Sequence, residues 1–203
     1  MLISLKRRWA VVVMLMSMTV FISFHPLARQ PSLGFSLQAP PSRQAVTPTA
    51  STASLEQAAL TRYLAAKYEK PPALIHRIVA AAYREAAQLH LPPLLLLAII
   101  EKESSMEPRS INTFGATGLM QIVPRFHRDK LRQVAHPDGL LNPEANIKIG
   151  TQILAEYIQE KKGDIDGALR KYSGNTRNYL LRVRAFTTEL DHIRRTTAPT
   201  QPT

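Results

Sequence analysis

Cysteine is absent from the 203 residues of this chain. That absence excludes a disulfide-stapled scaffold, a Cys-ligated zinc or iron–sulfur site, a thiol nucleophile and a lipid anchor attached through cysteine. Glycine, with 8 residues, and aromatic residues, at 6%, are also sparse, whereas proline is plentiful at 15 residues. The length and the 45% hydrophobic content fit one globular domain with tails.

Acidic residues are outnumbered, with 15 Asp and Glu against 26 Lys and Arg. The formal net charge of +11 favours an anionic partner, which can be nucleic acid, a membrane surface or an acidic polymer. The six histidines show no metal-ligand spacing, and no glycine-rich phosphate loop or serine nucleophile elbow is present. We therefore expect neither a metal nor a cofactor.

The N-terminus has the pattern of an export signal. Residues 1–8 carry three basic residues and no acid, and residues 9–24 form an apolar run. A 16-residue helix is roughly 24 Å long, shorter than the ~30 Å hydrocarbon core. Residues 1–28 are thus either a cleaved signal peptide or a short anchor in the inner membrane. Pro26 makes a poor cleavage site before Ala28, and the basic flank predicts that the remaining chain lies outside the cytoplasm.

The remaining chain divides by composition. Residues 29–53 are rich in Pro, Ser, Thr and Gln and predict a flexible linker. Residues 54–195 predict the folded domain, and residues 196–203 a disordered tail. Apolar residues recur at helical spacing and no convincing period-2 run occurs, so the fold class is all-α. Expected helices cover residues 55–70, a segment after 71–72, residues 94–106 and 143–162, a short segment before Gly174, and a final helix that includes Tyr179 on its apolar face.

Two glutamates near the end of the third expected helix point to different sides. Leu96, Ile99, Ile100 and Glu103 are spaced i, i+3, i+4 and i+7, so they share one face. Glu101 lies roughly 200° around the helix from Glu103. Burial against apolar residues should raise the pKa of the Glu103 carboxyl, which suits a general acid. A salt-bridged structural glutamate has the same spacing.

The residues around Glu103 favour the first interpretation. The stretch LLLAIIEKESSMEPRSINTFGATGLMQIVP joins a helix ending in Glu-Ser to a glycine-containing loop that returns with Gly-Leu-Met-Gln. It resembles the soluble lytic transglycosylase family, whose catalytic domain has a goose-lysozyme-like fold. The resemblance covers roughly residues 89–181. NPEANIKIGTQIL is similar to the family's Asn…Asn-Ile…Gly helix, and ALRKYSG stands where the family has Ala-Tyr-Asn.

This resemblance implies roles for individual residues. Glu103 matches the single catalytic acid and base, and Ser104 follows it as in the family. Met120 and Gln121 match residues that line the saccharide cleft. Tyr172 matches the tyrosine whose hydroxyl orients the catalytic carboxyl. We also expect Gly118 to let the loop backbone approach a sugar closely.

The sequence departs from the family pattern at three places. Ser173 replaces the motif asparagine, Asn112 stands where serine is commoner, and Met106 stands where an aromatic residue is common. An apolar contact survives at Met106 without an aromatic stacking surface.

The resemblance also implies a reaction. Glu103 would protonate the glycosidic oxygen between N-acetylmuramic acid and N-acetylglucosamine of peptidoglycan, and then accept the proton of the muramic C6 hydroxyl as a 1,6-anhydro ring closes. Most glycosidases use two carboxylates, and the sequence places no second acid opposite Glu103. A hydrolytic lysozyme of the same fold is an alternative, and so is a weakly catalytic wall-binding module of a secretion or pilus complex.

The expected location follows from the export signal. The enzyme should act on glycan strands at the periplasmic side of the bacterial inner membrane, either anchored through residues 9–24 or released. Export separates the domain from DNA, so we do not expect nucleic acid as its partner.

Overall fold

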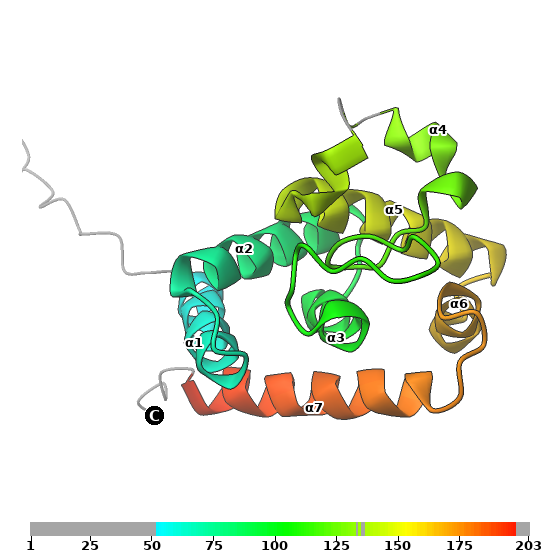
Figure 1. Ribbon diagram of the computed structural model, residues 1–203. Helices are drawn as coiled ribbons and strands as arrows, with labels where there is room; N and C mark the ends of the chain where they lie inside the picture. The colour runs from blue at the N-terminus through cyan, green and yellow to red at the C-terminus, as the bar shows by residue number, and fades with distance from the viewer. Residues whose placement is uncertain (1–51, 133, 135–136, 198–203) are drawn as a thin grey trace, which may run out of the picture. The chain divides into compact units, whose positions relative to one another are not determined.

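The computed structural model describes residues 52–132, 134 and 137–197 (Figure 1). The predicted export segment and nearly all of the predicted linker lie outside these residues. Within the described ranges, none of the helices is both long and apolar enough to cross a membrane. The apolar run at residues 9–24 lies outside the described ranges, so this finding does not cover it. The helices are α1 (Thr52–Lys67), α2 (Pro72–Gln88), α3 (Pro93–Ser104), α4 (Arg128–Leu131), α5 (Pro143–Glu160), α6 (Ile165–Tyr172) and α7 (Tyr179–Thr197), with 3₁₀ turns η1 (Pro124–Phe126) and η2 (Pro137–Leu141).

The all-α prediction is confirmed. In the part of the chain that the structure describes, extended pairing is limited to isolated bridges that join Thr117 to Ile111 and to Ile122. Some expected boundaries were wrong. Helix α1 spans Thr52–Lys67, whereas the expected first helix covered residues 55–70. Helix α7 continues to Thr197, two residues into the expected tail.

Helix α3 is the central element of the core. Every residue from Leu94 to Ile100 is buried, which matches a helix that is apolar on all sides. It packs against α2 and α7, while α7 also contacts α1 and α6. In Figure 1, α7 runs along one side of α3, from α1 toward α6, and α5 lies on the other side. Each fully buried Leu or Ile side chain contributes about 1.5–3 kcal/mol.

The end of α3 is set by backbone conformation. The expected helix reached Met106, but the helix ends at Ser104 because Ser105 and Met106 both adopt positive φ, at 50° and 63°. This left-handed pair reverses the chain, and Met106 is fully buried below the turn. The loop that follows therefore returns past the end of α3, where Glu103 lies (Figure 1).

Candidate active site

Helix α3 carries Glu103 one turn beyond the buried residues Ile99 and Ile100. Glu101 points elsewhere and accepts a hydrogen bond from the hydroxyl of Tyr68 at 3.2 Å. The expected separation of the two carboxylates by helical geometry is therefore present in the structure.

Among the residues that the structure describes, one side chain donates directly to the Glu103 carboxylate. The Tyr179 hydroxyl, at the start of α7, donates to Glu103 Oε1 at 2.7 Å. Burial raises the pKa of the Glu103 carboxyl, and this effect exceeds the lowering by the Tyr179 hydrogen bond and by the positive charge of Lys102. A carboxyl held more protonated than usual can deliver a proton near neutral pH.

Glu103 opens into a hollow of about 150 Å³, which continues into a larger one of about 710 Å³. We call the two together the cleft. Within the described residues, Glu103 is the one carboxylate lining either hollow. The two hollows share Asn112, Ala116, Gln121, Tyr172, Ser173 and Thr176.

Gln121 lies in this shared wall, as expected for a residue that lines a cleft. Its backbone has a φ of +46°, unusual for a residue with a side chain. Its side-chain Nε2 donates to the carbonyls of Ser110 at 3.1 Å and Gly118 at 2.9 Å. Both donor positions are thus used within the loop, and the amide oxygen is the polar atom left for a ligand.

Met120 does not line the cleft, contrary to expectation. Its side chain is fully buried and packs over Gly150 of α5, where a Cβ atom would stand 2.7 Å from Met120 Cβ. Glycine at position 150 is therefore required by the close approach of Met120.

Gly118 has a similar internal role. With φ at +80°, a Cβ there would overlap the Asn146 side chain, with Asn146 Cγ at 2.8 Å, and the carbonyl oxygen of Leu140. The expectation that Gly118 leaves room for a sugar is not what the geometry shows. It leaves room for Asn146.

Tyr172 and Ser104 also differ from expectation. The Tyr172 hydroxyl donates to the Met120 carbonyl at 2.8 Å, so it holds the loop and is not the hydroxyl bonded to Glu103. Its ring still lines the cleft.

The Ser104 hydroxyl donates to the Ile100 carbonyl at 3.0 Å within α3, and Ser104 is not among the residues that line either hollow.

Two exposed phenylalanines stand at the rim of the larger hollow. Phe114 and Phe126 are 72% and 67% exposed and come from different segments. Arg125 connects them, because its guanidinium donates to the Phe114 carbonyl at 2.9 Å and lies 4.7 Å from the centre of the Phe126 ring. Two exposed aromatic rings thus line the larger hollow, and Arg125 joins the backbone of one to the ring of the other.

Sequence reasoning missed Tyr179 and Asn146. Tyr179 was assigned to the apolar face of the last helix, and its periodicity gives no sign of a polar role. Asn146 is fully buried, accepts from Met120 N at 2.8 Å, and donates to the carbonyls of Thr117 at 2.9 Å and Leu140 at 2.8 Å. An asparagine amid apolar helix residues was the available signal.

No group of three or more His, Asp or Glu side chains is arranged to hold a metal ion in residues 52–132, 134 and 137–197. The cleft presents the Glu103 carboxyl, the Tyr179 hydroxyl and neutral amide and hydroxyl groups, together with the basic side chains of Lys102, Arg125 and Lys171.

Comparison with known proteins shows which families and proteins this chain resembles. The family model of the transglycosylase SLT domain matches residues 80–185. The transglycosylase of Enterobacteria phage PRD1 is 35% identical over 94 residues, which cover 45% of this chain and 32% of the phage protein. The soluble lytic murein transglycosylase of Escherichia coli (strain K12) is 37% identical over 79 residues, covering 36% of this chain and 12% of that protein.

The chain thus spans about a third or less of the length of these curated relatives. Among solved structures, an inactive mutant of lytic transglycosylase Slt from Pseudomonas aeruginosa aligns with a TM-score of 0.45 at 23% identity. That alignment covers 59% of this chain and 22% of the other.

Proposed function

This chain belongs to the transglycosylase SLT domain family, whose model spans more than half of its residues, and from that premise we propose that it is a peptidoglycan lytic transglycosylase with Glu103 as its acid and base. The observation that carries the proposal is the solitary carboxyl of Glu103. It is buried, has a raised pKa and opens into the cleft, where the described residues supply no second acid.

A solitary carboxyl favours a reaction in which the substrate supplies the nucleophile. Glycosidases that use water or a protein nucleophile generally place two carboxyls around the bond to be cleaved. In the proposed reaction, protonated Glu103 gives its proton to the oxygen between N-acetylmuramic acid and N-acetylglucosamine. The C1–O bond breaks, and the muramic acetamido group stabilises the positive charge at C1.

The second step returns the proton to the enzyme. The Glu103 carboxylate accepts the proton of the muramic C6 hydroxyl as O6 bonds to C1, which closes the 1,6-anhydro ring. No water is consumed, and Glu103 ends protonated as it began. The Tyr179 hydrogen bond holds the carboxylate while it acts as the base, so we assign Tyr179 as a positioning residue.

The walls of the cleft combine apolar and neutral polar groups that suit a sugar chain. Phe114 and Phe126 offer apolar ring faces, and Asn112, Ser173 and Thr176 offer neutral polar groups. Apolar faces combined with a few fixed polar groups are typical of small-molecule sites. The proposed substrate-binding residues are thus Gln121, Tyr172 and the two phenylalanines, with Ser104, Gly118 and Met120 supporting the surrounding backbone.

We further propose the domain order expected from the sequence. Residues 1–28 direct export or anchor the chain, residues 29–53 form a tether, and the domain reaches glycan at the periplasmic side of the inner membrane. A secretion or pilus complex that needs local opening of the wall is the proposed setting for such an enzyme.

The test is digestion of purified peptidoglycan by the full chain and by Glu103→Gln, followed by mass spectrometry of the released fragments. We expect ends one water lighter than reducing ends, resistant to borohydride and absent with the variant. Reducible ends of full mass would make the protein a lysozyme. No release by either protein would favour the wall-binding module.

A further inference from the structure

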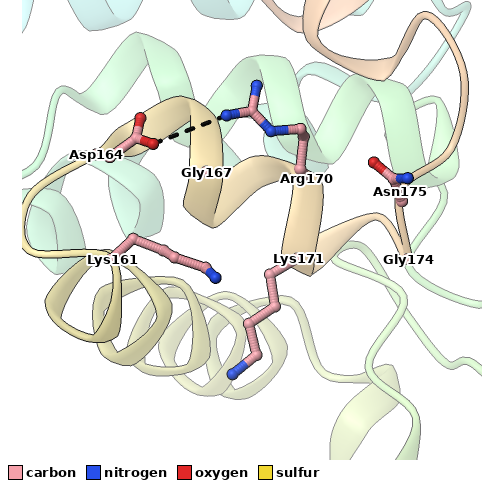
Figure 2. A pocket seen from close by; sticks show the side chains of 7 residues that line it. All are labelled: Lys161, Asp164, Gly167, Arg170, Lys171, Gly174 and Asn175. Carbon is pink, nitrogen blue, oxygen red and sulfur yellow. Dashed lines mark ion pairs between the residues drawn. The ribbon is translucent and has the colours of Figure 1, made fainter.

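A basic pocket lies beside the cleft, at the turn between α5 and α6 (Figure 2). Its volume is about 440 Å³. It adjoins the larger hollow, because Lys171 and Gly174 line both. It is lined by Lys161, Asp164, Gly167, Arg170, Lys171, Gly174 and Asn175.

The pocket contains more positive than negative charge, with three cationic side chains and one carboxylate. Two of the cations have partners: Arg170 Nη2 lies 3.7 Å from Asp164 Oδ2, and Lys171 pairs with Glu160 outside the pocket. Lys161 makes no ion pair or side-chain hydrogen bond with any residue in the described part of the chain. In Figure 2 its ammonium group points into the space beside α6, while Lys171 extends away from Arg170.

A glycine in the pocket wall accommodates the Asp164 side chain. Gly167 is buried within α6, where glycine costs about 1 kcal/mol relative to alanine. A Cβ atom at this position would stand 2.5 Å from Asp164 Oδ2 and 3.5 Å from Lys161 Cγ. A side chain at position 167 would therefore displace the Asp164 carboxylate, which lies against Gly167 and faces Arg170.

We propose that this pocket is a subsite for a carboxylate of the peptide that hangs from the glycan strand, with Lys161 as its principal contact. The inference rests on the proposed function, because a glycan in the cleft is what brings its peptide to the adjoining pocket. An extended peptide spans about 3.3–3.6 Å per residue, so a stem of a few residues can cross from one hollow to the next. An ammonium group without a partner among the described residues can supply the charge-assisted hydrogen bond that a carboxylate requires.

Binding to full-length protein carrying Glu103→Gln tests the inference without turnover. The probes are two synthetic muropeptide tetrasaccharides of equal length, one with free peptide carboxylates and one with the same groups capped as carboxamides. Isothermal titration calorimetry should show the carboxylate probe binding about two-fold to five-fold tighter, within the range measured for one exposed ion pair. The preference should weaken as salt is raised.

Variants assign that preference to one residue. Lys161→Gln should remove it, and Lys161→Arg should keep it because the charge remains. Lys148→Gln serves as the matched control, since Lys148 is exposed on α5 and is not among the residues that line the pocket. It should leave the preference unchanged.

Several outcomes would overturn the inference. A preference that survives Lys161→Gln, or equal binding of the two probes, would refute the subsite and leave the proposed function standing. If inorganic phosphate displaced the carboxylate probe and acetate did not, the ligand of the pocket would be a phosphate-bearing wall polymer and not a peptide carboxylate. Failure of both probes to bind, together with no release from peptidoglycan by the unsubstituted protein, would refute the proposed function itself.

Discussion

Tyr179→Phe is the sharpest test of how the cleft controls Glu103. The substitution removes one oxygen atom and keeps a ring that is buried at the start of α7. Burial raises the pKa of the Tyr179 hydroxyl far above its usual range, so the hydroxyl keeps its proton and can donate it to the Glu103 carboxylate. What is lost is therefore one hydrogen bond, of 2.7 Å, to the carboxylate.

The size of the effect follows from the charge of the acceptor. A hydrogen bond to a charged group contributes about 1.5–3 kcal/mol, which corresponds to roughly 10-fold to 150-fold in rate if it is used in the transition state. We expect kcat to fall within that range and KM to change little, because the hydroxyl holds the carboxylate and need not contact the distant sugars.

The pH dependence provides a second and independent readout. The Tyr179 hydrogen bond lowers the pKa of Glu103, so its removal raises that pKa further. The proposed reaction needs protonated Glu103 in the free enzyme, and this form is lost as the pH rises through its pKa. The alkaline limb of the kcat/KM profile should therefore move to higher pH in Tyr179→Phe.

Two tyrosine controls separate this role from general structure. Tyr83→Phe, on α2 against the main core, should leave the rate and the pH profile unchanged. Tyr172→Phe removes the bond to the Met120 carbonyl and should lower the rate without moving the alkaline limb. If Tyr172→Phe shifted the limb and Tyr179→Phe did not, the assignment of the two hydroxyls would be wrong.

Three further predictions concern stability and binding. Glu103→Gln should raise the free energy of unfolding at pH 7 by about 0.5–2 kcal/mol, and with it the melting temperature, because the raised pKa of Glu103 makes its buried carboxylate unfavourable. This gain should vanish as the pH falls to the usual pKa of 4.5, and a constant gain would contradict it. Gly118→Ala should lower the free energy of unfolding in urea by about 2–4 kcal/mol, because φ is positive and the new Cβ overlaps Asn146 and Leu140. Gly115→Ala, with φ at +79° but open space around the new Cβ, should lower it by about 1 kcal/mol. In the Glu103→Gln protein, Phe126→Ala should weaken the binding of chitohexaose about 2-fold to 12-fold, because one aromatic contact is lost. Leu181→Ala is the control: Leu181 is also exposed, and its replacement should have no effect.

The sequence was most informative where local pattern decides structure. The spacing of Leu96, Ile99, Ile100 and Glu103 predicted both the burial of α3 and the separate environments of Glu101 and Glu103, because helical periodicity depends only on the chain itself. The end of α3 was less predictable. Ser105 has no strong preference for a positive φ, and it adopts one because burial of Met106 requires the turn.

The partner of Glu103 was not predictable for a different reason. Tyr172 and Tyr179 are separated by one loop, and both have an apolar ring with a polar tip. Which hydroxyl reaches Glu103 depends on where α6 and α7 lie relative to α3, and of these two helices α7 makes the extensive contact with α3. Because of this tertiary packing, the Tyr179 hydroxyl bonds to the Glu103 carboxylate and the Tyr172 hydroxyl bonds to the Met120 carbonyl in the loop.

The loop that carries Gln121 owes its shape to α5. It has almost no strand pairing, so its backbone groups need other partners once they are buried. Asn146 supplies them from within the core, with one side-chain oxygen and one amide group serving three backbone atoms. Gly150, one helical turn later on the same face, admits Met120 against the helix. The motif residues Gly118 and Met120 are therefore fixed by their fit to α5, and that fit sets Gln121 beside Glu103 before any substrate arrives.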